Sequence, residues 1–278
     1  MQLVIGEIVL KRAVSFIFSL VFLSCTLWAD KDGVPAYRLP LPDALPSVPV
    51  TAHRVLPLGQ PSLVAHAVKA NTPSTRYGID VSRYQNNIDW QEVSRDSRVT
   101  FVYIKATESS GLVDRTYVRN LQEARKVGLP VGVYHFFSPT TPSHQQLANF
   151  LGTVDPRTQD LVPIVDVEIA PKRKSQVAPF LRRLRAFIDG VERHFGCKPM
   201  IYTSQNFYIT YLAGKFLDCP FMFARYAEDV PVVPDDVRFL VWQFTASGRI
   251  RGIEGDVDRS CMMNPYTVED IHYRPKRK

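Results

Sequence analysis

Cysteine and glycine are both scarce in this chain. Its 278 residues include four cysteines and 14 glycines. Four cysteines are too few to build a disulfide scaffold of this size, and so few glycines exclude a collagen-like repeat. No internal repeat and no long glycine-rich or glutamine-rich tract is evident either. What is left is an ordinary globular composition, because 45% of the residues are apolar and 22% are charged.

Acidic residues are fewer than basic ones. The 34 Lys+Arg and 27 Asp+Glu residues give a net charge of +7, and the isoelectric point is about 9.2. This balance suits an anionic partner, which is nucleic acid, a membrane surface or an anionic polymer. No nucleic-acid recognition motif accompanies the positive charge. We therefore expect no nucleic-acid partner.

The N-terminus carries an apolar stretch, at residues 13–23, preceded by a Lys-Arg pair. The stretch has the length of the hydrophobic part of a secretory signal and is shorter than the ~20 residues of a membrane span. Residues 1–29 are therefore predicted to be a signal peptide or a membrane or lipid anchor. Cleavage, lipidation at Cys25 and retention as an anchor all stay open. Each outcome predicts export, to the periplasm, the cell envelope or the exterior.

Residues 30–75 are rich in proline. Eight of the 21 prolines lie between Asp32 and Pro73, without a helical or strand periodicity. Proline at this density favours extended segments and removes backbone donors. This segment is predicted to be a linker to a domain at residues 76–278.

Short apolar runs alternate with helical patterns from residue 76 onward, as expected of β/α units with a parallel sheet. A strong amphipathic helix at residues 177–195 ends before Gly196, and a second helical face begins at Tyr117 and ends at Gly128. Later connections are shorter. We predict an α/β protein, a single irregular (β/α) barrel of TIM-like type with shortened later helices. The predicted strands are Tyr77–Val81, Phe101–Ala106, Val131–Phe137, Val162–Val167, Met200–Thr203, Phe221–Tyr226, Leu240–Phe244 and Gly255–Asp258.

Polar residues recur at or near the ends of these runs. In a β/α barrel the carboxyl ends of the strands meet at one mouth, where catalytic groups lie. Several carboxylates are therefore expected to face one another. The polar residues are Asp80, Lys105, Glu108, His135, Asp166, Glu168, Tyr202, Arg225, Tyr226, Gln243 and Asp258.

Asp166 and Glu168 form the most informative pair. Their i, i+2 spacing puts both carboxylates on one face of a strand. Two like charges held close together raise one pKa toward the range of a general acid. The alternatives are two solvated acids or a Mg²⁺ or Ca²⁺ site. No His-x-Glu or His-x-x-x-His pairing accompanies the acids, which disfavours a zinc hydrolase, and we expect no metal and no cofactor.

A series of motifs resembles the glycoside hydrolase family 25 lysozymes, and the resemblance covers about residues 76–266. The order and spacing of the motifs are more specific than any one of them. The motifs are Gly78-Ile79-Asp80-Val81-Ser82-Arg83-Tyr84-Gln85, Ile88-Asp89-Trp90, Phe101-Val102-Tyr103-Ile104-Lys105-Ala106-Thr107-Glu108, Gly132-Val133-Tyr134-His135-Phe136, Asp166-Val167-Glu168, Trp242-Gln243-Phe244 and Gly255-Asp256-Val257-Asp258.

The resemblance implies hydrolysis of the β-1,4 bond between N-acetylmuramic acid and N-acetylglucosamine in peptidoglycan. It makes Glu168 the general acid, Asp166 its carboxylate partner, and Asp80 and Asp258 further acids of the cleft. Two positions depart from the family pattern. Ser109 stands where glycine usually follows the Lys-x-Thr-Glu glutamate, and Arg259 and Ser260 stand where a hydrophobic residue and asparagine are usual. We expect these departures to affect the rim rather than the carboxylates.

Four further residues are predicted to bind substrate. Tyr134, Tyr226 and Trp242 are candidates for stacking on sugar rings, although aromatic residues in strands are often core. Arg225 is a candidate for a bidentate contact with a muramyl carboxylate, the alternative being a structural ion pair. The runner-up to the enzyme is a non-catalytic barrel that binds the cell wall. In either case peptidoglycan strands are the expected partner and the protein is expected to be a monomer.

Overall fold

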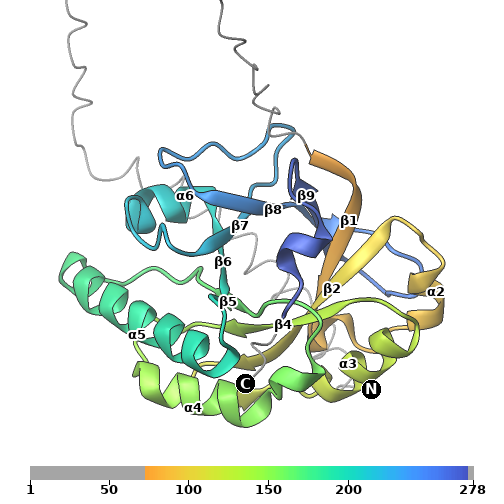
Figure 1. Cartoon of the computed structure of the whole chain (residues 1–278), viewed down its shortest axis with the longest axis horizontal. Coiled ribbons are helices and arrows are strands. Elements are labelled where there is room, and N and C mark those ends of the chain that lie inside the picture. The colour runs from red at the N-terminus through yellow and green to blue at the C-terminus, as the bar shows by residue number, and fades with distance from the viewer. Residues whose placement is uncertain (1–72, 275–278) are drawn as a thin grey trace, which may run out of the picture. The chain divides into compact units, whose positions relative to one another are not determined.

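The computed structural model describes residues 73–274, which form one closed barrel (Figure 1). The strands are β1 (Pro73–Val81), β2 (Val99–Glu108), β3 (Leu112–Val113), β4 (Val131–Phe136), β5 (Ile164–Asp166), β6 (Met200–Ser204), β7 (Pro220–Ala224), β8 (Arg238–Gly248) and β9 (Val257–Met263). The α-helices are α2 (Trp90–Ser94), α3 (Tyr117–Lys126), α4 (Ser143–Thr153), α5 (Val177–Phe195) and α6 (Gln205–Phe207). The predicted signal or anchor segment, 1–29, lies outside the described residues, and β1 begins three residues before the predicted domain start.

Eight strands close the barrel, in the order β1-β9-β8-β7-β6-β5-β4-β2, and β2 pairs with β1 to complete it. The short strand β3 pairs only with β2. The pairs from β1–β2 through β7–β8 are parallel, whereas β9 is antiparallel to both of its neighbours. The predicted irregular barrel is therefore confirmed, and one irregularity is the direction of its last strand.

The last strand corrects one sequence prediction. The run 255–258 is predicted to be a strand that ends at Asp258, but β9 begins at Val257 and continues to Met263. Because β9 is antiparallel, its first residues lie at the mouth, beside the carboxyl end of β1. Asp258 pairs with Asp80 there. Asp258 therefore lies at the mouth, as predicted, but near the start of its strand and not at the end.

Aromatic side chains fill the barrel interior, and two glycines make room for them. A Cβ on Gly78 would lie 2.1 Å from the ring of Phe101, and a Cβ on Gly132 would lie 2.4 Å from the ring of Tyr103. Both rings are buried within the same apolar cluster. The interior below the mouth is thus a packed core, as in other β/α barrels, and not a pore.

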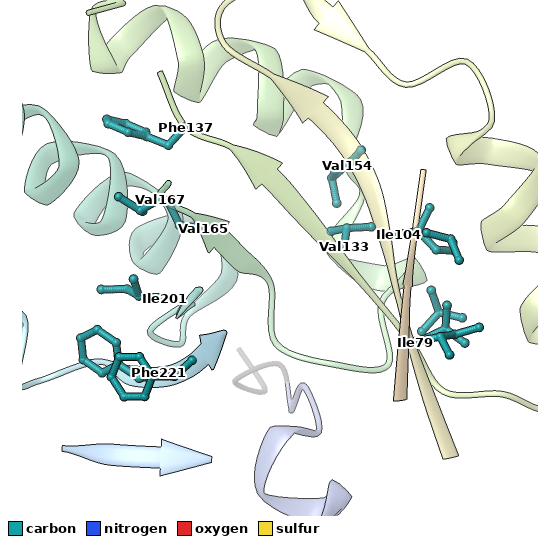
Figure 2. Packing of buried hydrophobic residues seen from close by; sticks show 14 of the residues in the cluster. Ile79, Ile104, Val133, Phe137, Val154, Val165, Val167, Ile201 and Phe221 are labelled. Atoms are coloured by element: carbon teal, nitrogen blue, oxygen red, sulfur yellow. The ribbon is translucent and has the colours of Figure 1, made fainter. Parts of the chain in front are cut away.

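A second apolar cluster lies between the strands and the outer helices (Figure 2). Ile79, Ile104 and Val133 contribute to it from three neighbouring strands. Figure 1 shows α3, α4 and α5 along one side of the barrel. The long helix α5 matches the predicted range, and Gly196 ends it in a left-handed conformation with φ of 76°, which glycine adopts without strain.

The helices differ in how clearly the sequence predicts them. Helix α4 is absent from the predicted elements because its buried face is short and partly polar, with only Gln146 and Phe150 fully buried. The later connections hold only short helices, as predicted: α6 spans three residues and continues into a π-helical turn at Tyr208–Leu212. No helix within residues 73–274 is long and apolar enough to cross a membrane.

Candidate active site

The four predicted carboxylates meet at the mouth of the barrel. Asp80 lies near the end of β1 and pairs in register with Asp258 at the start of β9. Asp166 ends β5, and Glu168 follows it by two residues. The charges of Asp80, Glu168 and Asp258 all act on Asp166. Acids that lie far apart in the sequence of the domain therefore meet at one place in the fold.

Gln243 on β8 connects this cluster to two tyrosines. Its side-chain oxygen accepts hydrogen bonds from the hydroxyls of Tyr202 and Tyr226, both at 2.7 Å. Its amide nitrogen donates to Asp80 Oδ2 at 3.1 Å, and Ser260 Oγ donates to the same oxygen at 3.2 Å. Gln243 thereby fixes the orientation of Asp80 and of both hydroxyls.

Asp166 is buried and incompletely hydrogen-bonded. Its exposed fraction is 7%, and no group of residues 73–274 hydrogen-bonds to its Oδ1. Burial, and then the negative charge of Glu168, raise its pKa well above the usual value, while Lys105 lowers it. A buried carboxylate oxygen without a partner is costly, so this atom is available to accept a hydrogen bond from a ligand.

Glu168 is half-buried and has the pKa of a general acid. Its pKa is raised to about 7, with burial as the largest cause; the Tyr202 hydroxyl and Lys105 act to lower it, and the charge of Asp80 acts to raise it. Burial likewise raises the pKa of Asp80 to about 6, against hydrogen bonds from Gln243 and Ser260 that lower it. Burial is also the largest cause of the raised pKa of Asp258. At neutral pH, Glu168 therefore retains a substantial protonated fraction.

Tyr134 and Tyr226, two of the predicted substrate-binding residues, lie with the carboxylates. The pKa of Tyr134 is raised well above its usual value by burial first and then by the charges of Asp166, Asp80 and Asp258. Tyr226 is 47% exposed while its hydroxyl binds Gln243. Its ring is therefore accessible beside the acids.

The side chains of Trp242 and Arg225 contact other residues of the fold and not the carboxylates. Trp242 is 5% exposed, packs edge-on against Phe244 and donates its indole N–H to the Arg225 carbonyl at 3.0 Å. The Arg225 guanidinium donates to Asp229 Oδ2 at 2.6 Å and to the Asp229 carbonyl at 3.0 Å. This geometry favours a core role for the tryptophan and a structural ion pair for the arginine, so their substrate contacts stay predictions.

His135 lies on the outer face of its strand, away from the acids. It is fully buried, its Nδ1 lies 2.7 Å from Thr107 Oγ1, and its ring stacks on Phe187. Burial lowers its pKa to about 4, so it is neutral. It is therefore a core histidine.

Some site residues are weakly marked in the sequence. Tyr202 and Gln243 are predicted at the mouth as polar residues in strands, but nothing in the sequence indicates that they bind each other. Ser260 is marked in the sequence only as a departure from the family pattern, because its contact with Asp80 depends on the pairing of β9 with β1. These contacts follow from strand register, which only the closed barrel determines.

Clustered carboxylates at a barrel mouth, one of them a half-buried acid with a raised pKa, define a site typical of enzymes that hydrolyse glycosidic bonds. Comparison with known proteins agrees. The family model for Glycosyl hydrolases family 25 matches residues 79–253. Protein YegX of Escherichia coli (strain K12) is 38% identical over 209 residues, which cover 74% of this chain and 75% of YegX.

Two further proteins extend the comparison. Lysozyme M1 of Streptomyces globisporus is 29% identical over 197 residues, 66% of each chain. The structure of a family 25 glycosyl hydrolase from Bacillus anthracis is similar with a TM-score of 0.62 and 28% identity, and the match covers 73% of this chain and 94% of that one. The chain belongs to glycosyl hydrolase family 25. The resemblance to family 25 lysozymes is thereby confirmed.

Proposed function

We propose that this protein is an exported N-acetylmuramidase. It cleaves the β-1,4 bond between N-acetylmuramic acid and N-acetylglucosamine in peptidoglycan, with Glu168 as the general acid and Asp166 assisting. The observation that carries the proposal is the pairing of a half-buried Glu168, with its pKa of about 7, with Asp166, whose Oδ1 is buried and unpaired. The similarity to Lysozyme M1 supports the same substrate class.

Glu168 supplies the first proton. The glycosidic oxygen leaves poorly as an alkoxide, so it must be protonated as its bond to C1 breaks. Glu168 carries that proton at neutral pH because burial disfavours its charged form. The resulting carboxylate then accepts a proton from the water that attacks C1 in the second step, which restores the acid.

Asp166 ends β5 and Glu168 follows it by two residues, so both acids come from the same strand end. In the proposal this leaves the opposite face of the sugar ring without a protein nucleophile. In the proposed mechanism the oxygen of the substrate's 2-acetamido group attacks C1 from that face, as in substrate-assisted glycosidases. Asp166 Oδ1 accepts the acetamide N–H and stabilises the positive charge that develops on the amide. Asp80 and Asp258 stabilise the developing cation without transferring the first proton.

Identification of the new reducing ends tests the proposal. Peptidoglycan is digested with the enzyme, reduced with borohydride and analysed by mass spectrometry. New muramitol ends are expected, and at least about 10²-fold fewer with Glu168→Gln as the matched control. New glucosaminitol ends would identify a glucosaminidase instead. A chain that binds peptidoglycan but produces no new ends would support the alternative, a non-catalytic wall-binding barrel.

Export is the second part of the proposal, and it rests on the apolar run at residues 13–23, outside the described residues. Alkaline phosphatase fused after Pro49 is active only if the fusion point crosses the cytoplasmic membrane. We expect an active fusion. An inactive one would contradict export, while membrane fractionation of an active fusion separates an anchored protein from a released one.

A further inference from the structure

Around the Asp166–Glu168 pair, acidic groups outnumber basic ones. Among residues 73–274, the only cation with an appreciable effect on the pKa values of both acids is Lys105. The acidic groups and hydroxyls that face the pair come from every neighbouring strand. They are Asp80 on β1, Tyr134 on β4, Tyr202 on β6, Tyr226 after β7 and Asp258 on β9.

Lys105 is itself buried, with an exposed fraction of 7%. Burial disfavours a charged ammonium unless other groups compensate for the lost water. Its Nζ donates to Glu108 Oε2 at 2.6 Å and lies 4.8 Å from the centre of the Phe136 ring, a cation–π distance. Lys105 pairs in register with Tyr134. Phe136, whose ring lies beside the ammonium, pairs in register with Asp166 on β5. The ammonium that Glu108 binds therefore lies next to the end of β5, where the carboxylate pair begins.

Strand irregularity permits this ion pair. Residues three apart in a regular strand point to opposite faces, so Lys105 and Glu108 would not meet. The pairing of β2 with β4 shifts register between Lys105 and Thr107, and an irregularity of this kind re-aims the side chains that follow it. The side chain of Glu108 can consequently reach the ammonium of Lys105, although both residues lie on β2.

The backbone at Glu108 and Ser109 is also held in place by hydrogen bonds. Ser109 adopts a left-handed conformation with φ of 49°, donates its N–H to the Phe136 carbonyl at 3.1 Å and bonds Thr141 Oγ1 through its hydroxyl at 2.9 Å. Asn149 of α4 donates to the carbonyls of Glu108 and Ser109 at 3.4 and 3.1 Å. A non-glycine residue in this conformation is strained, and these contacts hold it there.

We infer that Lys105 is a positioning residue whose ammonium is the counter-charge of the Asp166–Glu168 pair, and that Glu108 sets how much of this charge the pair experiences. The inference rests on the proposed function for its catalytic meaning. Lys105 lowers the pKa of both acids, so it reduces the cost of a negative charge on the pair. Glu108 competes for the same ammonium, which keeps the proton on Glu168 from being lost at too low a pH.

Replacement of Lys105 and replacement of Glu108 should shift the carboxyl titrations in opposite directions. Lys105→Met removes the charge and keeps an apolar stem on Phe136, so both carboxyls should titrate at higher pH, by about one unit, the lower end of the ~1–3 units that an adjacent opposite charge produces. Glu108→Gln leaves the ammonium to the carboxylate pair, so both should titrate at lower pH. The double variant should resemble Lys105→Met alone.

The primary measurement is an NMR titration of the carboxyl carbons in protein labelled with ¹³C at Asp and Glu, and the secondary one is the pH profile of peptidoglycan turnover. Lys198→Met is the matched control, because it removes one cation from a partly exposed ion pair with Glu192 and Asp218. We expect it to leave both titrations unchanged.

Unchanged titrations of Asp166 and Glu168 in folded Lys105→Met would overturn the inference, and so would shifts in the same direction in the two single variants. If Lys105→Met does not fold, the downward shift in Glu108→Gln still decides, because Glu108 is partly exposed. Expected titration shifts in a chain that makes no muramitol ends would support the counter-charge and contradict the proposed function.

Discussion

At the residue scale, the site depends on keeping one carboxyl protonated among several acids. Glu168 does so through burial, with a pKa of about 7. The closeness of Asp166 and Glu168 is predictable from their i, i+2 spacing, although the strand itself ends at Asp166 and Glu168 follows it. The partners that orient the other acids are not predictable in this way. Gln243 and Ser260 reach Asp80 only because three strands close around it.

Replacement of the proposed acid tests this assignment. Glu168→Gln keeps the shape of the side chain but cannot donate the proton, so we expect hydrolysis to fall by about 10²–10⁴-fold while glycan binding and fold persist. Asp166→Asn should also be severe, and Asp80→Asn less so. The alkaline limb of the native pH profile should lie near 7. Nearly native turnover in Glu168→Gln, together with its complete loss in Asp80→Asn, would contradict the assigned roles.

The buried acids should also lower stability. The pKa of Asp80 rises from 3.8 in a free carboxyl to about 6 in the fold, so between these values the folded state keeps a proton that the unfolded state has lost. Stability therefore falls as pH rises from about 4 to 6, by roughly 2–3 kcal/mol for a shift of about two pKa units. The contribution of Asp80 is fully unfavourable above pH 6.

Asp80→Asn should remove this penalty. We expect the variant to be more stable than the native protein at pH 7, with the difference disappearing near pH 4, as measured by urea unfolding at both pH values. The introduced amide can still accept the hydrogen bonds of Gln243 and Ser260 through its oxygen. An equal change in unfolding free energy at the two pH values would show that ionisation is not the cause.

At the element scale, the strands and the long helix are predictable because their apolar patterns are strong. Helix α5 carries a continuous apolar face, whereas α4 buries Gln146 together with Phe150 and so shows little periodicity. The direction of β9 is not predictable either, because an antiparallel strand has the same local pattern as a parallel one. Only the pairing of β9 with β1 shows that it begins at the mouth.

Close packing of β1 on β2 leads to a prediction about this element pair. An added Cβ in Gly78→Ala would lie 2.1 Å from the Phe101 ring, which is 1% exposed and cannot swing away. Overpacking of this kind costs about 1–3 kcal/mol of unfolding free energy, and Phe101→Leu in the same chain should recover part of it. Gly111→Ala is the control, because nothing lies within 4 Å of its added Cβ. Urea unfolding that does not distinguish the two alanine variants would contradict this packing.

At the scale of the whole molecule, part of the excess of basic residues lies at the mouth of the barrel. Lys172, Arg173 and Lys174 follow Glu168 in the connection between β5 and α5, and all three are exposed. No ion pair joins them to an acidic residue of the described chain, and the first turn of α5 contains no acidic residue either. Positive charge there adds to the positive end of the helix dipole instead of opposing it.

This arrangement costs stability and suits an anionic substrate. The stem peptides of peptidoglycan carry carboxylates, so we expect the Lys172–Lys174 segment to strengthen binding to the wall through screened electrostatics. Lys172→Gln with Lys174→Gln should weaken binding to insoluble peptidoglycan by about two- to tenfold at low salt. The difference should vanish near 1 M salt, where the Debye length is about 3 Å.

A control with the same change of charge separates this local effect from net charge. Lys126 and Arg193 lie in the last turns of α3 and α5, and helices of a β/α barrel end at the side opposite the mouth. Lys126→Gln with Arg193→Gln also removes two positive charges, so a general attraction of a cationic protein to the wall would weaken equally in both pairs. We expect loss of binding only in the pair at the mouth, measured by co-sedimentation over a series of salt concentrations. Equal losses would instead attribute wall binding to the overall charge of +7.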